Sequence, residues 1–268
     1  MIMVTGASGQ LGSLVHTELL QRGLSPLAAS RHPVRFAALG RQFDFDDAST
    51  LDLSGVTTLV LVSAGYAEDD VVIARHDRVI SAAEDQGVAH VVYTSLVGAG
   101  DHLGFALAHR WTERRLRRSP LSWTVLRNGL YAELFGQLNA PVEGVVRAPF
   151  GDGALAAVAR ADLAEVAATV AADPSAHRER TYELVCTTTV DAAGLAAELG
   201  AVYSPTSLGQ RRAELAVAGL LPFQPAMLMS IYSAVSAGFL AGTGGDLTDL
   251  LTGPPRPTSP IAVAAARG

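Results

Sequence analysis

The sequence contains no lysine, and all 20 of its basic residues are arginine. This absence excludes Schiff-base chemistry and the lysine on which phosphate-binding loops of nucleotide hydrolases depend. There is one cysteine, Cys186, so neither an internal disulfide nor a cysteine-rich metal site is available. Cys186 ends an apolar run that indicates a buried strand, and we assign it no role. We expect no bound metal.

An excess of positive charge is also missing. The formal net charge of -6 argues against nucleic acid as a partner, because phosphate binding requires a basic surface. The longest apolar region, 215–240, contains Pro222 and Pro225, so it does not predict a membrane span. A first strand at residue 1 leaves no room for a targeting segment, and we expect a cytoplasmic protein. A hydrophobic content of 49% with 17% charged residues is typical of a globular fold.

The first twelve residues carry the most informative pattern. An apolar run over 1–4 predicts a strand, three glycines follow at a spacing of three, and a helical pattern begins at once. In this context the glycines predict a dinucleotide site: the first permits a tight turn, the second lets the backbone approach a pyrophosphate, and the third lets the helix pack closely. A tight turn without a ligand remains the alternative. The predicted cofactor contacts in this motif are Gly6, Ser8, Gly9, Gln10, Leu11 and Gly12.

Strands alternate with helices as far as residue 128, which predicts an α/β fold with a doubly wound parallel sheet. We expect a dinucleotide-binding core over 1–130, with part of 155–186 packing back on it. The remainder, 131–268, predicts a smaller α+β lobe that binds the substrate and is interleaved with the core. The expected strands of the core are 1–4, 24–30, 42–45, 56–63, 88–95 and 121–126.

The end of the second expected strand favours NADPH, although NADH stays possible. NAD enzymes usually place a carboxylate there for the ribose 2′-hydroxyl, whereas this chain has Arg31, whose planar guanidinium suits a 2′-phosphate, and Ser30 as a second donor. A solvated loop arginine is the alternative for Arg31. Asp44 and Phe45 end the third strand where an adenine would lie, and the adjacent Asp46 is equally compatible with a plain helix cap.

The nicotinamide half of the site is expected at the ends of the fourth and fifth strands. Ser63 follows the fourth, and Tyr93-Thr94-Ser95 ends the fifth. Classical short-chain dehydrogenases then carry a tyrosine and a lysine four residues apart on the next helix, where this chain has Phe105 and His109. Phe105 cannot donate a proton and no lysine exists, so the usual tyrosine–lysine route is excluded. His109 remains a candidate to bind the ribose or the substrate, or an ordinary histidine of an amphipathic helix.

Substrate-binding residues are expected from several segments. Asn128 and Tyr131 directly follow the sixth strand, where a loop can reach the nicotinamide carboxamide or the substrate, so with His109 they are our catalytic candidates. The arginine run over 110–118 predicts a solvated helix face. Apolar and aromatic residues are candidates to line a pocket, with plain core packing as the alternative. These substrate candidates are Phe105, Tyr131, Phe150, Phe223 and Met227, with Met229 and Tyr232 nearby.

Together, these segments resemble the NmrA-like atypical short-chain dehydrogenases, in particular the NAD(P)H quinone oxidoreductase type 2 group. The Tyr-Thr-Ser, His-x-x-x-Glu and Arg-Asn-Gly combination is the more specific part, and the early motifs are shared by all NmrA-like proteins. The match extends over nearly the whole chain. Its segments are 4–12, 30–33, 44–47, 91–96, 109–113, 124–131, 159–162 and 250–258.

The resemblance implies a Rossmann-type reductase that passes hydride from NADPH to a quinone. Some relatives reduce polycyclic quinones of aromatic-polyketide pathways, which implies a small aromatic substrate. A non-catalytic dinucleotide sensor, as some NmrA-like regulators are thought to be, and a reductase of imines or other conjugated acceptors are the alternatives. The sequence leaves open a homodimer and a partner enzyme from the same pathway.

Overall fold

The structure, a computed structural model, describes residues 1–64 and 67–268. Its chain divides into two compact units, and each is assembled from three separate stretches of sequence. Unit 1 comprises Met1–Leu96, Leu107–Arg127 and Arg160–Tyr182, and unit 2 comprises Val97–Ala106, Asn128–Ala159 and Glu183–Gly268.

Unit 1 is built on a seven-stranded sheet with the order β3-β2-β1-β4-β5-β6-β9. The pairs β1–β2, β1–β4, β2–β3 and β4–β5 are parallel. Every residue of β2 and β5 is buried, as expected for strands covered on both faces. The strands are β1 (Ile2–Val4), β2 (Leu27–Ser30), β3 (Gly40–Gln42), β4 (Thr58–Val62), β5 (His90–Leu96), β6 (Ser122–Asn128) and β9 (Arg180–Leu184).

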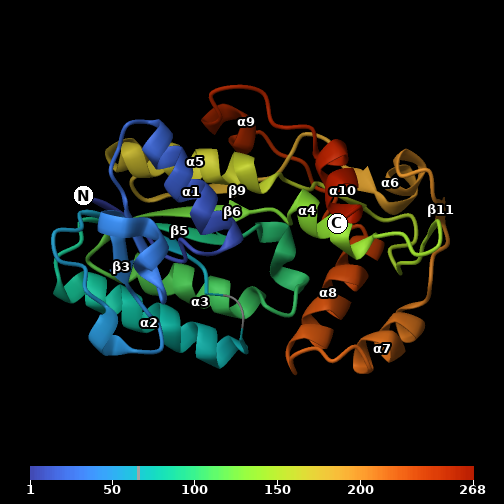
Figure 1. Ribbon diagram of the computed structural model, residues 1–268, viewed down its shortest axis with the longest axis horizontal. Helices are drawn as coiled ribbons and strands as arrows, with labels where there is room; N and C mark the ends of the chain where they lie inside the picture. Colours follow the sequence, from blue (N-terminus) through green and yellow to red (C-terminus); the bar gives the residue numbers. More distant parts are fainter. Residues whose placement is uncertain (65–66) are drawn as a thin grey trace. The chain divides into compact units, whose positions relative to one another are not determined.

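Helices cover both faces of this sheet. Helices α1 and α5 lie on one face and α2 and α3 on the other (Figure 1). Helix α5 is rich in small buried residues, which lets α1 pack closely against it. One core cluster contains Met3, Leu59, Val79 and Leu116, which come from two strands and two helices. The helices are α1 (Gln10–Gln21), α2 (Asp69–Asp85), α3 (Ala106–Arg117) and α5 (Arg160–Ala172).

Unit 2 is mostly helical and has two small ladders, β8 with β10 (antiparallel) and β7 with β11 (parallel). Helix α4 packs on α10 so closely that a Cβ on Gly136 would lie 2.1 Å from the carbonyl oxygen of Ala262. None of the helices in the described residues is long and apolar enough to cross a membrane. The elements are α4 (Ala132–Leu138), β7 (Val145–Val146), β8 (Ala154–Leu155), β10 (Val190–Asp191), α6 (Ala192–Glu198), β11 (Val202–Tyr203), α7 (Leu208–Ala216), α8 (Gln224–Ser236), α9 (Asp246–Leu250) and α10 (Thr258–Ala266).

Several element boundaries differ from the sequence prediction. β3 ends at Gln42, because 44–47 forms a tight turn in which Asp44 and Asp47 bridge. The segment Pro33–Leu39 is a 3-10 helix with a kink at Ala37. The sequence pattern predicts a helix over 103–118, whereas in the structure a short 3-10 helix, Gly98–His102, comes first and α3 starts at Ala106.

Candidate functional site

The turn between β1 and α1 requires glycine at two positions. Gly6 has φ +57°, in the left-handed region that side chains disfavour. A Cβ on Gly12 would lie 2.3 Å from the carbonyl oxygen of Gly6, so α1 can start this close to the turn only without a side chain there. The N–H of Gly9 donates to the same oxygen at 2.8 Å and closes the turn.

Helix α1 begins without a capping side chain. Gly9 occupies the N-cap position and has no side chain that could accept from the first N–H groups of the helix. The first turn contains no acidic residue. The first N–H groups of a helix have no partner within the helix and carry partial positive charge. The start of α1 therefore fits a pyrophosphate, the group that the glycine motif predicts.

Two arginines lie near this turn. Arg31 directly follows β2 and is exposed. Arg35, which the sequence analysis did not single out, donates from Nη2 to the carbonyl oxygen of Ala7 at 3.1 Å. Its guanidinium carbon lies 4.7 Å from the centroid of the Phe36 ring. Among the residues that the structure describes, no carboxylate pairs with Arg31 or Arg35, so both cations remain available to an anion.

The acidic segment after β3 is largely engaged within the protein. Asp44 accepts from the N–H of Asp46 at 3.0 Å. Asp46 accepts from Nε of Arg75 at 2.9 Å, and this hydrogen bond lowers the pKa of Asp46. Asp47, rather than Asp46, caps the following 3-10 helix by accepting from a backbone N–H. Asp44 and Phe45 are the two residues predicted to contact the adenine. Phe45 is partly buried and packs against the core cluster through apolar contacts.

Tyr93 in β5 and the half-buried His109 in α3 form a hydrogen-bonded pair. The Tyr93 hydroxyl lies 2.9 Å from Nδ1 of His109. Tyr93 is fully buried, and burial raises its pKa, so the phenol stays protonated. Burial, with the nearby Arg110 guanidinium, lowers the pKa of His109 to about 4. Both rings are therefore neutral at pH 7.

The other predicted residues on these two strands hold the structure together through polar bonds. The N–H of Ser63 donates to Oγ1 of Thr94 at 3.0 Å, which ties the end of β4 to β5. The hydroxyl of Ser95 donates to Oε1 of Glu113 at 2.7 Å. Thr94 and Ser95 are both 4% exposed, so their hydroxyls form hydrogen bonds inside the protein.

Glu113 is the centre of a buried charge cluster. Its carboxylate binds Arg127 and Arg110 at 2.8 Å and Arg117 at 3.2 Å, and its side chain is 1% exposed. Burial alone would raise the pKa of Glu113, but the hydrogen bonds from Arg127 and Ser95 outweigh it and the pKa is lowered. The prediction of a solvated arginine face is therefore wrong for Arg110, which pairs with Glu113, and for Arg115, which pairs with Asp77 and Glu84; Arg117 is exposed as predicted.

Three predicted residues lie in unit 2: Asn128 at the end of β6, Tyr131 just after it, and Phe105 just before α3. Asn128 is 5% exposed, and its side-chain oxygen has no hydrogen-bond partner among the described residues. Its backbone oxygen accepts from the N–H of Val97 at 2.9 Å. Tyr131 is half-buried at the start of α4. Phe105 is half-buried immediately before α3.

The remaining substrate candidates do not share one environment. Phe150 is fully buried, with its ring 5.3 Å from that of Phe135 and 5.0 Å from that of Tyr232. Phe223 occupies the N-cap position of α8, and Met227 lies in its first turn. Both are partly exposed. The structure therefore places Phe150 in the core of unit 2, apart from the surface at the start of α8.

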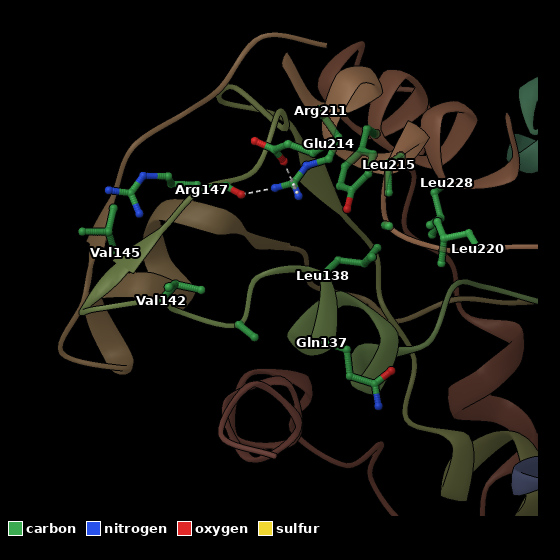
Figure 2. A pocket seen from close by; sticks show the side chains of 13 residues that line it. Gln137, Leu138, Val142, Val145, Arg147, Arg211, Glu214, Leu215, Leu220 and Leu228 are labelled. Carbon is green, nitrogen blue, oxygen red and sulfur yellow. Dashed lines mark hydrogen bonds and ion pairs between the residues drawn. The ribbon is translucent and has the colours of Figure 1, made fainter. Parts of the chain in front are cut away.

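Unit 2 also contains a cavity of about 440 Å³ between α4, β7, α7 and α8 (Figure 2). Arg211 lies on its wall and pairs with Glu214 at 2.8 Å, and its Nη2 donates to the carbonyl oxygen of Arg147. None of the five predicted substrate-binding residues lines this cavity, although Tyr232 does. The lining residues are Gln137, Leu138, Ala140, Val142, Val145, Arg147, Arg211, Glu214, Leu215, Ala218, Leu220, Leu228 and Tyr232.

Two side chains with evident roles in unit 1 were missed by the sequence analysis. A second arginine only four residues after Arg31, with no carboxylate between them, is a signal that could have found Arg35. Glu113 belongs to the His-x-x-x-Glu segment of the resemblance. The sequence gives no sign that Glu113 would gather arginines from two different elements.

Comparisons with known proteins now decide the family. A family model described as NAD(P)H-binding matches residues 6–174, more than half of the chain. The chain belongs to the NAD(P)H-binding family. Quinone oxidoreductase 2 of Escherichia coli K12 is 37% identical to this NAD(P)H-binding protein over 213 residues, 74% of this chain and 73% of that protein.

Two solved structures extend the likeness to almost the full length. The NADPH-dependent quinone oxidoreductase of Escherichia coli, solved with NADPH, matches with a TM-score of 0.88 at 32% identity, over 98% of this chain and 99% of that chain. The triphenylmethane reductase of Citrobacter sp., solved with NADP(H), matches with a TM-score of 0.88 at 29% identity, over 99% of each chain.

These findings confirm the resemblance to the quinone oxidoreductase type 2 group and the α/β fold class. The predicted class is also confirmed: the protein is an NAD(P)H-dependent oxidoreductase. The predicted cofactor agrees with the family, and both solved relatives hold the phosphorylated dinucleotide.

Proposed function

We propose that this protein reduces quinones with hydride from NADPH, without the tyrosine–lysine pair of classical short-chain dehydrogenases. The observation that carries the proposal is the pair of residues at the tyrosine–lysine spacing, Phe105 and His109, in a chain without lysine. Quinone oxidoreductase 2, which resembles this chain over most of its length, supports a quinone as the acceptor.

A quinone suits a site that lacks a strong built-in acid. Its reduced oxygens are phenolic and far less basic than an alkoxide, so proton donation in the transition state matters less. NADPH supplies the hydride. The quinone takes up this hydride and one proton to become the hydroquinone. Because the pKa of His109 is about 4, its ring is neutral at pH 7 and holds no imidazolium proton, so the proton comes from water.

His109 then acts by orientation. The Tyr93 hydroxyl lies 2.9 Å from Nδ1 of His109, and this hydrogen bond holds the neutral imidazole ring in one orientation. We propose that the ring so held hydrogen-bonds a ribose hydroxyl or a quinone oxygen. Holding the reactants in a near-attack arrangement contributes to the rate without any proton transfer.

Arg31 and Arg35 together account for a preference for NADPH over NADH in this proposal. A 2′-phosphate carries about two negative charges at pH 7, and a guanidinium binds phosphate with charge-assisted, bidentate hydrogen bonds. Arg35 is held at the glycine turn by its bond to the Ala7 carbonyl, which positions its charge before the cofactor binds. Neither arginine is neutralised by a carboxylate of the described residues.

On the substrate side we propose roles for Asn128 and Tyr131. The unsatisfied side-chain oxygen of Asn128 offers an acceptor for an amide N–H such as that of the nicotinamide carboxamide. Tyr131, half-buried at the start of α4, offers a ring and a hydroxyl to a flat aromatic acceptor. Phe105, Phe223 and Met227 provide apolar surface, and a polycyclic quinone is the acceptor class that we favour.

The proposal is tested by following NADPH oxidation with a panel of acceptors: 1,4-benzoquinone, 1,4-naphthoquinone, a tetracyclic quinone, an imine and a simple ketone. We expect turnover with the quinones, increasing with ring number, and no turnover with the ketone. Tight binding of NADPH and NADP⁺ without oxidation by any acceptor would instead establish a dinucleotide sensor. Turnover of the imine alone would establish the other reductase class.

A further inference from the structure

His76, in the middle of α2, is a fully buried histidine that makes two hydrogen bonds. The backbone N–H of Ala64, just beyond β4, donates to its Nε2 at 3.0 Å. Its Nδ1 lies 2.8 Å from Oγ1 of Thr112 in α3. Burying a polar ring is costly unless it is hydrogen-bonded, and an aliphatic side chain could fill the same space without that cost. The two hydrogen bonds therefore indicate that His76 does more than fill space.

The partners of His76 fix its tautomer. A backbone N–H can only donate, so Nε2 must accept from Ala64 and carries no proton. The hydroxyl of Thr112 donates to the carbonyl oxygen of Ala108 at 2.7 Å, so it accepts from Nδ1–H of His76. Burial, together with His109 and Arg75, lowers the pKa of His76 to about 3 and keeps this single neutral form at all ordinary pH values.

The bond to Ala64 reaches the edge of the sheet at which dinucleotides bind. In open α/β sheets, ligands occupy the crevice outside the carboxyl ends of the strands. Ala64 follows β4, and its neighbour Ser63 is bound to Thr94 of β5. The same end of β4 faces the glycine turn, because a Cβ on Gly6 would lie 3.8 Å from Val62.

The bond to Thr112 reaches α3 one turn from His109. Thr112 bonds the carbonyl of Ala108, the residue before His109. The rings of His76 and Tyr93 are also in edge-to-face contact, with centroids 5.6 Å apart. One side chain thus connects the backbone after β4 with the helix that carries the Tyr93–His109 pair.

We infer that His76 is a positioning residue of the dinucleotide site, which holds the backbone at Ala64 in the conformation that receives the cofactor. The inference rests on the binding of NADPH at this edge, as in the proposed function. It assigns His76 no contact with the reacting atoms. Its effect is on how tightly the cofactor binds.

The chain provides a matched control in His90. This histidine is also buried, at 4% exposed, and is the first residue of β5, at the opposite end of the strand from Thr94. Its Nε2 lies 2.9 Å from Oγ1 of Thr124, whose hydroxyl donates to the carbonyl oxygen of His177 at 2.7 Å. His90 therefore resembles His76 in its burial and in its bond to a threonine hydroxyl, but it lies at the amino ends of the strands and its ring accepts from no backbone N–H of the described residues.

Three substitutions separate the two bonds of His76. His76→Gln keeps an oxygen near the position of Nε2 and can still accept from Ala64, His76→Asn keeps a donor near Nδ1 for Thr112, and His76→Leu removes both. We expect the Kd for NADPH, measured by fluorescence titration, to rise about tenfold or more in the Asn and Leu variants, since a buried N–H loses its acceptor. The Gln variant should bind within about threefold of the unchanged protein.

Hydrogen exchange without cofactor gives a second readout, independent of activity. The amide of Ala64 should exchange faster in the Asn and Leu variants and stay protected in the Gln variant. His90→Leu should lower the urea midpoint and leave both the NADPH Kd and the Ala64 exchange unchanged.

The inference is overturned if all three His76 variants bind NADPH as the unchanged protein does, or if His90→Leu weakens binding equally. Should the Leu variant fail to fold, the contrast between Gln and Asn still decides. Failure of the unchanged protein to bind NADPH would instead remove the proposed function.

Discussion

Helix α3 carries two buried polar clusters of opposite character. Towards α2 and β5 it contributes to a neutral cluster, in which His109 bonds Tyr93 and Thr112 bonds His76. Around Glu113 it contributes to a charged cluster with Arg110 and Arg127. Neutral hydrogen-bonded rings can position a ligand without adding a charge near it. Buried ions hold an element in place, and the loss of one partner greatly lowers the free energy of unfolding because the other charge stays buried and unpaired. We therefore expect the first cluster to govern binding and the second to govern stability.

The largest effect is expected from the charged cluster. Glu113→Gln leaves Arg110 and Arg127 without their carboxylate, and breaking a buried ion pair typically costs about 3–5 kcal/mol of unfolding free energy. Urea denaturation of the cofactor-free protein measures this loss. Stability within about 1 kcal/mol of the unchanged protein would show that the cluster is not what anchors α3.

The second-largest effect is expected on the preference for NADPH over NADH. In the double variant Arg31→Ala, Arg35→Ala, we expect the ratio of kcat/KM for NADPH to that for NADH to fall about 100-fold, because two charge-assisted phosphate interactions are lost. Steady-state kinetics with a fixed quinone gives the ratio. Each single variant should account for part of the loss, and an unchanged ratio in Arg35→Ala would confine the phosphate site to Arg31.

The two clusters should affect the free energy of unfolding in different pH ranges. Folding lowers the pKa of His76 and His109 from 6.5 to about 3 and about 4, so the unfolded chain binds more protons below pH 6.5. Stability should therefore fall as the pH decreases from 6.5 towards 4. The lowered pKa of Glu113 removes stability only below about its ordinary value of 4.5.

Urea unfolding at several pH values checks this order. The slope between pH 6.5 and 5 should become shallower in His76→Gln and should persist in Glu113→Gln. An equal slope in both variants would mean that His76 does not contribute to it.

The smallest effect is expected where an ion pair is exposed. Asp46 pairs with Arg75 by the β3 edge with half of its side-chain surface accessible. Surface ion pairs contribute little, so Asp46→Asn should change the unfolding free energy by less than about 1 kcal/mol. A loss comparable with that of Glu113→Gln would contradict the contrast between exposed and buried charge.

Local patterns account for what the sequence could predict. The glycine turn, the alternating strands and helices and the missing lysine are each readable from a short stretch, and the structure builds the turn around Gly6 and Gly12 as expected. His109 could be singled out because its spacing is that of a known catalytic pair. Its partner Tyr93 was predicted to lie at the same site, but as a residue that contacts the cofactor and not as a partner of His109.

Long-range pairing accounts for what the sequence could not predict. Glu113 and Arg127 are 14 residues apart and meet only because β6 runs beside α3. His76 gains its role from Ala64 and from Thr112, 36 residues away. The aromatic residues of unit 2 gave no periodic signal that distinguishes the core position of Phe150 from the partly exposed Phe223.

The central claim, hydride transfer from NADPH to a quinone without a tyrosine–lysine pair, is tested most directly by a single turnover. The complex of protein and NADPH is mixed with excess 1,4-naphthoquinone in a stopped-flow instrument, and the nicotinamide absorbance is followed between pH 5.5 and 8. We predict complete oxidation at a rate that does not change with pH, because Tyr93 and His109 keep their protonation states throughout this range. NADPH that remains bound and unoxidised, or a rate that follows the titration of an acid near pH 7, would contradict the account.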